Sequence, residues 1–130
     1  MNKRVAFLFA ISMIFMMMLS ACGSSKEVSA VKDTGETFMA ALRDSDAITS
    51  WNMLTQNVQA EVGDIAKWQQ FILPRNFSEW KFLSTNVEKT AAQIDGEAVL
   101  SSNTYNIVLV FKKIDNYWKI AGVNIYFKSQ

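Results

Sequence analysis

The chain contains no histidine among its 130 residues and a single cysteine, Cys22. Histidine is the commonest metal ligand and the side chain that most often acts as a general base near neutral pH. Its absence excludes serine–histidine–aspartate, cysteine–histidine and histidine-based zinc schemes of catalysis. No glycine-rich phosphate-binding loop occurs either. We therefore expect no metal, no cofactor and no catalytic residues.

The chain also lacks an excess of charge of one sign. It has 13 lysines and arginines against 12 aspartates and glutamates, and the basic residues form no stripe. Nucleic acid is therefore not expected as a partner. Proline occurs once, at Pro74, and long hydrophobic runs are missing except at the N-terminus.

That one hydrophobic run begins the chain. Lys3 and Arg4 precede an apolar stretch from Val5 to Leu19 that only Ser12 interrupts. The stretch is about 15 residues long, shorter than the roughly 20 that a helix needs to cross a bilayer. A positive start, an apolar run and small residues at its end are typical of a secretory signal peptide.

The end of this run reads Leu19, Ser20, Ala21, Cys22 and resembles the lipobox of bacterial lipoproteins. The resemblance implies that residues 1–21 are removed and that Cys22 is acylated, with palmitate or a related chain, and anchored in a membrane. The protein would then lie in the bacterial cell envelope, at the outer membrane on the periplasmic side in a Gram-negative cell or on the outer face of the cell membrane in a Gram-positive one. A retained transmembrane helix and an ordinary signal peptide remain as alternatives.

Cleavage before Cys22 removes 21 of the 130 residues and leaves 109, which suit one small domain. With Cys22 acylated, no disulfide within the chain can form. The segment after Cys22, up to residue 30, is small and polar and is interpreted as a flexible tether. The folded domain is expected over residues 31–130.

Helical periodicity fills the first half of this domain. The spacing of Asp33 and Glu36 is that of a capping box and predicts a helix that starts within 30–34 and fades by 44–46. Asp46 can cap a second, short helix. A third helix is predicted from Asn57 to Ile72, where Pro74 stops it.

Strand periodicity fills the second half. The Asp95–Gly96 pair predicts a turn, and Asp115–Asn116 predicts a two-residue hairpin turn. The four strands expected around these turns are 80–89, 97–102, 104–113 and 117–127.

The hairpin turn at 115–116 sets a register, with Phe111 opposite Ile120, Leu109 opposite Gly122 and Lys112 opposite Lys119. Both faces of the hairpin are then apolar, whereas a sheet with one wet face alternates apolar and polar residues. One face is expected to meet the helices. The other is a candidate protein interface, formed by Val108, Val110, Val123 and Ile125.

Helices followed by four antiparallel strands are typical of an α+β fold. Residues 37–42 with Trp51 and Leu54, and the closing hairpin 107–120, resemble the nuclear transport factor 2-like (cystatin-like) superfamily. The resemblance implies N-terminal helices packed on the concave side of a curved, mainly four-stranded antiparallel sheet. Members of the superfamily include enzymes, binding modules and scaffolds, so the fold alone does not assign a function.

Large aromatic residues could line a pocket between helices and sheet, although in a domain of this size they more often form the core. The five candidates for such a pocket are Phe38, Trp51, Trp68, Phe82 and Trp118. Some enzymes of the superfamily use a buried aspartate with a tyrosine. The residues that could take those roles here are Asp44, Asp46, Asp64, Asp95, Tyr105, Tyr117 and Tyr126.

These observations favour a lipid-anchored envelope protein without enzymatic activity, which binds an envelope protein or a second copy of itself. A lipoprotein that binds a small apolar ligand is the first alternative. An isomerase- or hydratase-like enzyme with an aspartate base is the second.

Overall fold

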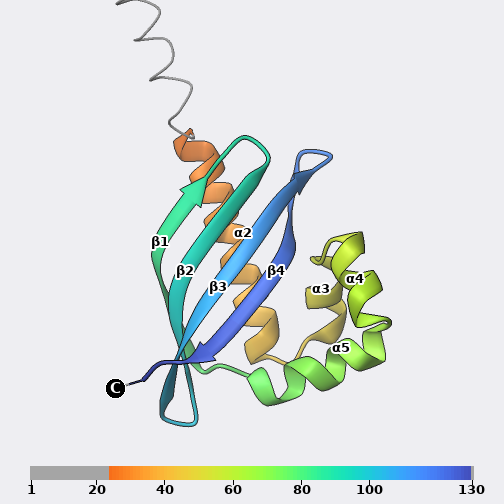
Figure 1. Cartoon of the computed structure of the whole chain (residues 1–130), viewed down its shortest axis with the longest axis vertical. Coiled ribbons are helices and arrows are strands. Elements are labelled where there is room, and N and C mark those ends of the chain that lie inside the picture. Colours follow the sequence, from red (N-terminus) through yellow and green to blue (C-terminus); the bar gives the residue numbers. More distant parts are fainter. Residues whose placement is uncertain (1–23, 130) are drawn as a thin grey trace, which may run out of the picture.

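A computed structural model describes residues 24–129, and its helices precede its strands as predicted (Figure 1). The predicted signal peptide and lipobox, with Cys22, lie outside the described residues. None of the helices between residues 24 and 129 is long and apolar enough to span a bilayer. The elements are α2 (Ser25–Arg43), α3 (Ala47–Asn52), α4 (Gln56–Val62), α5 (Ile65–Ile72), the 3₁₀ turn η1 (Leu73–Arg75), β1 (Glu79–Val87), β2 (Ala91–Leu100), β3 (Asn103–Ile114) and β4 (Tyr117–Phe127).

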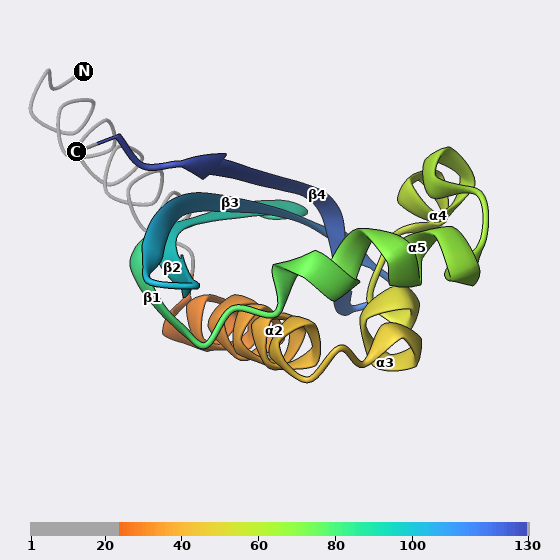
Figure 2. The same cartoon turned by 90° about the horizontal axis from the view of Figure 1, so that it is seen from below.

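The four strands form one antiparallel sheet in the order β1-β2-β3-β4. Figure 2 shows the sheet bending around α2, which lies on its concave side, while α3, α4 and α5 gather beyond the β4 edge. The α+β fold class expected from the sequence is therefore confirmed. We call the face toward α2 the inner face and the opposite one the outer face.

Helix α2 begins earlier than the sequence predicted. Ser24 caps it, because its hydroxyl accepts a hydrogen bond from the Glu27 amide at 3.3 Å. The prediction of a flexible tether up to residue 30 is wrong from Ser25 onward, and Asp33 and Glu36 lie inside the helix rather than at its start. The polar first turn gave no apolar periodicity, so the sequence offered no sign that it was helical.

The short helices follow the predicted caps only in part. The Asp46 carboxylate accepts from the Thr49 amide at 3.1 Å and caps α3, as predicted. The single helix expected over 57–72 is instead two helices, α4 capped by Thr55 and α5 capped by Asp64. Gly63 separates them with a φ of 107°, a conformation that favours glycine. Helix α5 ends at Ile72, before Pro74, as predicted.

The turn predicted at Asp95–Gly96 is wrong, because both residues lie within β2. Gly96 pairs with Phe82 beside a bulge in β1. A Cβ on Gly96 would lie 2.5 Å from the carbonyl oxygen of Lys81, so a side chain there would collide with the neighbouring strand. The absence of a side chain at Gly96 therefore allows β1 and β2 to approach each other closely, which is a common reason for a glycine within a strand.

The β3–β4 hairpin is the best-predicted element. Asp115 and Asn116 have φ values of 50° and 67°, as a two-residue hairpin turn requires. Phe111 pairs with Ile120 as predicted, but the register shifts between Val110 and Phe111. Beyond this bulge Leu109 faces Val123, not Gly122, so the predicted register is wrong there.

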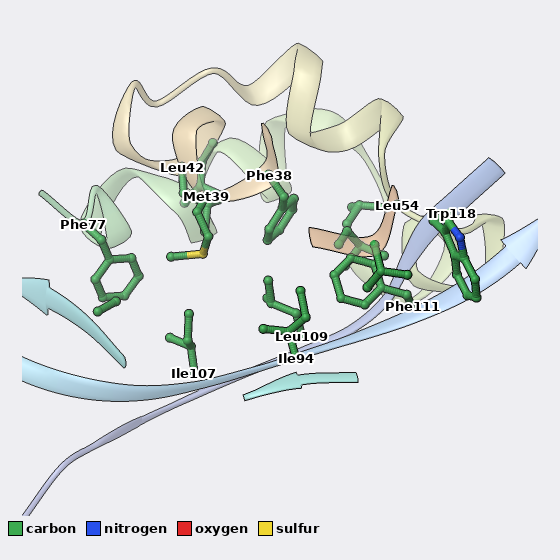
Figure 3. Packing of buried hydrophobic residues seen from close by; sticks show 14 of the residues in the cluster. Phe38, Met39, Leu42, Leu54, Phe77, Ile94, Ile107, Leu109, Phe111 and Trp118 are labelled. Carbon is green, nitrogen blue, oxygen red and sulfur yellow. The ribbon is translucent and has the colours of Figure 1, made fainter. Parts of the chain in front are cut away.

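The core fills the space between α2 and the inner face. Figure 3 shows Phe38 and Met39 of α2 pointing toward Ile94, Ile107 and Leu109 of the sheet. All five of these side chains are fully buried. This continuous apolar contact holds α2 against the sheet.

Candidate functional site

The five aromatic residues proposed as pocket lining belong to the packed interior. Phe38, Trp68 and Trp118 are buried in the core cluster, and Trp51 and Phe82 are half-buried and pack against it. The rings of Phe38 and Trp68 lie 6.3 Å apart, and the Trp68 indole nitrogen donates to the buried Ser50 hydroxyl at 2.8 Å. Side chains therefore occupy the space where a ligand would lie between α2 and the sheet.

Of the four candidate aspartates, Asp44, Asp46 and Asp64 are exposed and Asp95 is half-buried. Asp44 forms an ion pair with Arg43 at 2.9 Å, and the hydrogen bond from Arg43 holds the pKa of Asp44 below its usual value. The pKa of Asp46 is lowered by the hydrogen bond from the Thr49 hydroxyl. Asp64 caps α5, and Asp95 accepts from Ser84 and Gln93. Among residues 24–129, no aspartate or glutamate is buried.

The candidate tyrosines do not join these aspartates. The Tyr105 ring packs edge-on against Phe77 and Phe127, at centroid distances of 5.9 and 5.6 Å. Tyr117 and Tyr126 are exposed. Within the described part of the chain, no three acidic, histidine or cysteine side chains group as metal ligands would.

The candidate interface residues divide between the two faces of the sheet. Val108 and Val110 lie on the outer face, where Val110 is 37 % exposed. Because of the bulge, Val123 and Ile125 stand opposite Leu109 and Ile107 and pack against the core instead. The outer apolar strip consists of Val108, Val110, Ala121 and Gly122. Polar side chains border it at Gln93, Asn106 and Asn124.

A polar groove of about 640 Å³ lies at the end of the same face, between the β3–β4 hairpin and the segment that joins α3 to α4. Met53 and Thr55 hold this segment to β4 through backbone hydrogen bonds with Ile120 of 2.8 and 2.9 Å. Lys112 and Lys119 stand opposite each other, as predicted, and line the groove. The Lys119 ammonium donates to the carbonyl of Asn52 at 2.8 Å, so one of the two lysines has a fixed partner.

No protein-family model matches the sequence, and no curated protein matches it either. Solved structures do match. An NTF2-like protein of unknown function from Silicibacter pomeroyi aligns with a TM-score of 0.64 and 13 % identity, over 82 % of this chain and 100 % of that chain. A second, from Shewanella baltica, aligns with a TM-score of 0.64 and 12 % identity, over 84 % and 99 %. The chain has an NTF2-like fold.

The solved structures that share this fold do not share one name. A candidate dehydratase of the NTF2-like family from Streptomyces avermitilis aligns with a TM-score of 0.63 and 12 % identity, over 83 % of this chain and 100 % of that chain. At such identities the similarity concerns the fold alone. The residues of this chain must therefore indicate its function.

One polar cluster of this NTF2-like domain was not predicted from the sequence. Glu27, in the first turn of α2, accepts hydrogen bonds from the Lys113 ammonium at 3.0 Å and from the Trp118 indole nitrogen at 2.9 Å. Lys113 and then Trp118 lower the pKa of the Glu27 carboxyl from its usual value. The partners are 86 and 91 residues away in the sequence, so no local pattern could have revealed them.

Proposed function

We propose that this chain is a lipid-anchored protein of the bacterial cell envelope, and that its NTF2-like domain is a non-enzymatic module for binding a protein partner or a second copy of itself. Its anchor would be the acylated Cys22 of the lipobox. The observation that carries the binding role is the apolar strip on the outer sheet face, formed by Val108, Val110, Ala121 and Gly122.

The outer face has the composition of an interaction surface. Its apolar strip is small, and polar side chains from β2, β3 and β4 surround it. Protein interfaces commonly combine an apolar centre with a polar rim that remains partly hydrated. Val110 keeps 37 % of its surface exposed, whereas the apolar residues of the inner face are buried against α2.

The packed interior argues against the two alternatives. Binding a small apolar ligand between α2 and the sheet would require displacing core side chains such as Phe38 and Leu109. A dehydratase-like reaction, which the name of the Streptomyces avermitilis protein suggests, would require a base within reach of a bound substrate. The described carboxylates all lie at least partly in solvent, and several of them cap helices or form ion pairs.

Photocrosslinking of the full chain in its native envelope tests the proposed interface. A photoreactive residue would replace Val110 in one variant and Ile48 in a control variant. Ile48 is 68 % exposed on α3, so it is at least as accessible as Val110 but lies away from the outer face.

We expect a discrete crosslinked species from position 110 and little from position 48. The mass of that species distinguishes a homodimer from a complex with another protein. Equal yields from both positions, or no species at all from position 110, would contradict binding through the outer face.

A further inference from the structure

At one end of the domain, the start of α2, the β1–β2 turn and the β3–β4 hairpin are held together by side-chain and backbone contacts. The salt bridge from Glu27 to Lys113 and the hydrogen bond from Trp118 fasten the first helical turn to the β3–β4 hairpin. The Lys113 amide donates to the carbonyl of Thr90 at 2.8 Å, which fastens the β1–β2 turn to the same place. Figure 1 shows both turns at the same end of the domain as the start of α2. We call this end the tip and define it as residues 24–27, 88–90 and 112–119.

The tip is separated from the proposed anchor by a very short piece of chain. Only Gly23 and Ser24 stand between Cys22 and the first helical residue, Ser25. Three trans peptide steps span at most about 11 Å, whereas a tether up to residue 30 would have allowed roughly 30 Å. A lipid on Cys22 would thus hold the start of α2 close to the bilayer surface.

We infer that the domain stands on the bilayer by its tip and that the tip contacts anionic lipid headgroups. The inference rests on the proposed acylation of Cys22. The β2–β3 turn at Ser101 and Ser102 then lies at the far end, one strand length away. Strand β3 has 12 residues, which corresponds to roughly 40 Å at about 3.3 Å per residue.

Charge is distributed in the way that this orientation requires. The tip carries five basic residues against three acidic ones, and the rest of the chain after Cys22 carries six against nine. The tip is therefore positive although the processed chain as a whole is slightly negative, and basic residues near a bilayer are attracted to anionic lipids. The charged residues of the tip are Lys26, Lys89, Lys112, Lys113, Lys119, Glu27, Glu88 and Asp115.

The tip also exposes an aromatic residue. Tyr117 is 71 % exposed at the start of β4, and its cross-strand neighbour Ile114 is 38 % exposed. Tyrosine is enriched where membranes meet water, because its ring is apolar and its hydroxyl is polar. The same two residues would otherwise lie unprotected in solvent.

A pair of matched cysteine variants tests the orientation. Asn116→Cys and Ser102→Cys place a thiol in the second position of a hairpin turn at the tip and at the far end, respectively. The two residues have nearly the same φ, 67° and 68°, so the substitutions strain the backbone equally. With Cys22 acylated, the new thiol is the only reactive one, and a fluorophore can be attached to it in the full lipidated chain.

The labelled proteins are reconstituted into phosphatidylcholine vesicles with and without phosphatidylglycerol, and with a nitroxide quencher on the lipid headgroups. We expect several-fold stronger quenching at position 116 than at position 102, and a further increase at position 116 when phosphatidylglycerol is present. Lys89→Glu combined with Lys112→Glu should remove that increase. Lys67→Glu, an exposed lysine of α5, should leave it unchanged.

The outcomes separate this inference from the proposed function. Protein that neither incorporates labelled palmitate nor floats with vesicles would overturn both. Protein that floats but is quenched equally at positions 116 and 102, or more strongly at 102, would overturn the orientation while the lipid anchor stands. Quenching at position 116 that does not respond to phosphatidylglycerol would overturn the contact with anionic lipid.

Discussion

The two faces of the sheet come from the same strands but differ in what covers them. On the inner face, Leu109 is fully buried beneath α2, whereas Val110, the next residue, is 37 % exposed on the outer face. The sequence pattern predicted apolar residues on both faces of the β3–β4 hairpin. The bulge beside Val110 places Val123 and Ile125 on the inner face. A single inserted residue therefore divides a two-sided apolar hairpin into a core face and a free face.

The largest difference between the faces should appear in stability. Leu109→Ala should lower the free energy of unfolding by about 2–5 kcal/mol, because it leaves a cavity in packed surroundings. Val110→Ala should cost about 1 kcal/mol or less, because an exposed side chain loses little burial. Urea denaturation of the two variants makes the comparison. Similar losses for both would mean that the outer face is covered in the folded protein.

The two sheet glycines give a second matched pair. Gly96→Ala should destabilise the protein by about 1–3 kcal/mol, because the new Cβ would collide with the backbone of β1 at Lys81. Gly122→Ala, on the outer face, should change stability by about 0.5 kcal/mol or less, since its Cβ would meet Val110 at an ordinary 3.5 Å. Urea midpoints measure both. A neutral Gly96→Ala would show that the bulge in β1 can relax.

The smallest effect concerns the tip and its dependence on pH. Because the folded state lowers the pKa of Glu27 below 4.5, the ionised carboxylate stabilises the fold above that pH, and this contribution is lost as the pH falls through the lower value. Glu27→Gln should therefore flatten the acid side of the stability profile, measured by urea denaturation from neutral pH into the acid range.

A double-mutant comparison identifies the source of that pH dependence. Trp118→Phe keeps an aromatic ring but removes the indole nitrogen that donates to Glu27. Glu27→Gln should then have a smaller effect in the Trp118→Phe background than in the original chain. Equal effects in the two backgrounds would mean that Trp118 does not contribute to holding the carboxylate.

Local chemistry was sufficient to predict part of the fold. The hairpin turn at Asp115–Asn116, the Asp46 cap and the helix stop before Pro74 each depend on residues within a few positions of one another. The register was likewise correct from the turn as far as Phe111 and Ile120. Turn and cap preferences act over these short distances, so a single sequence contains them.

The remaining features depend on contacts between distant segments. Gly96 was interpreted as a turn residue because it follows an aspartate. A glycine is needed there because the backbone of Lys81 in β1 approaches closely, and the local sequence does not contain that contact. The first turn of α2 looked like a tether because Lys113 and Trp118, which hold it, lie in the last hairpin. The outer face was predicted as a candidate interface, but which residues of β4 lie on that face depends on the bulge, which the sequence did not reveal.

The most direct test of the account is the mass of the N-terminal peptide of the protein extracted from cell membranes. We predict that the chain begins at Cys22, that residues 1–21 are absent, and that the peptide carries acyl groups which Cys22→Ser abolishes. A membrane-extracted chain that retains residues 1–21, or that begins elsewhere with an unmodified Cys22, would contradict it.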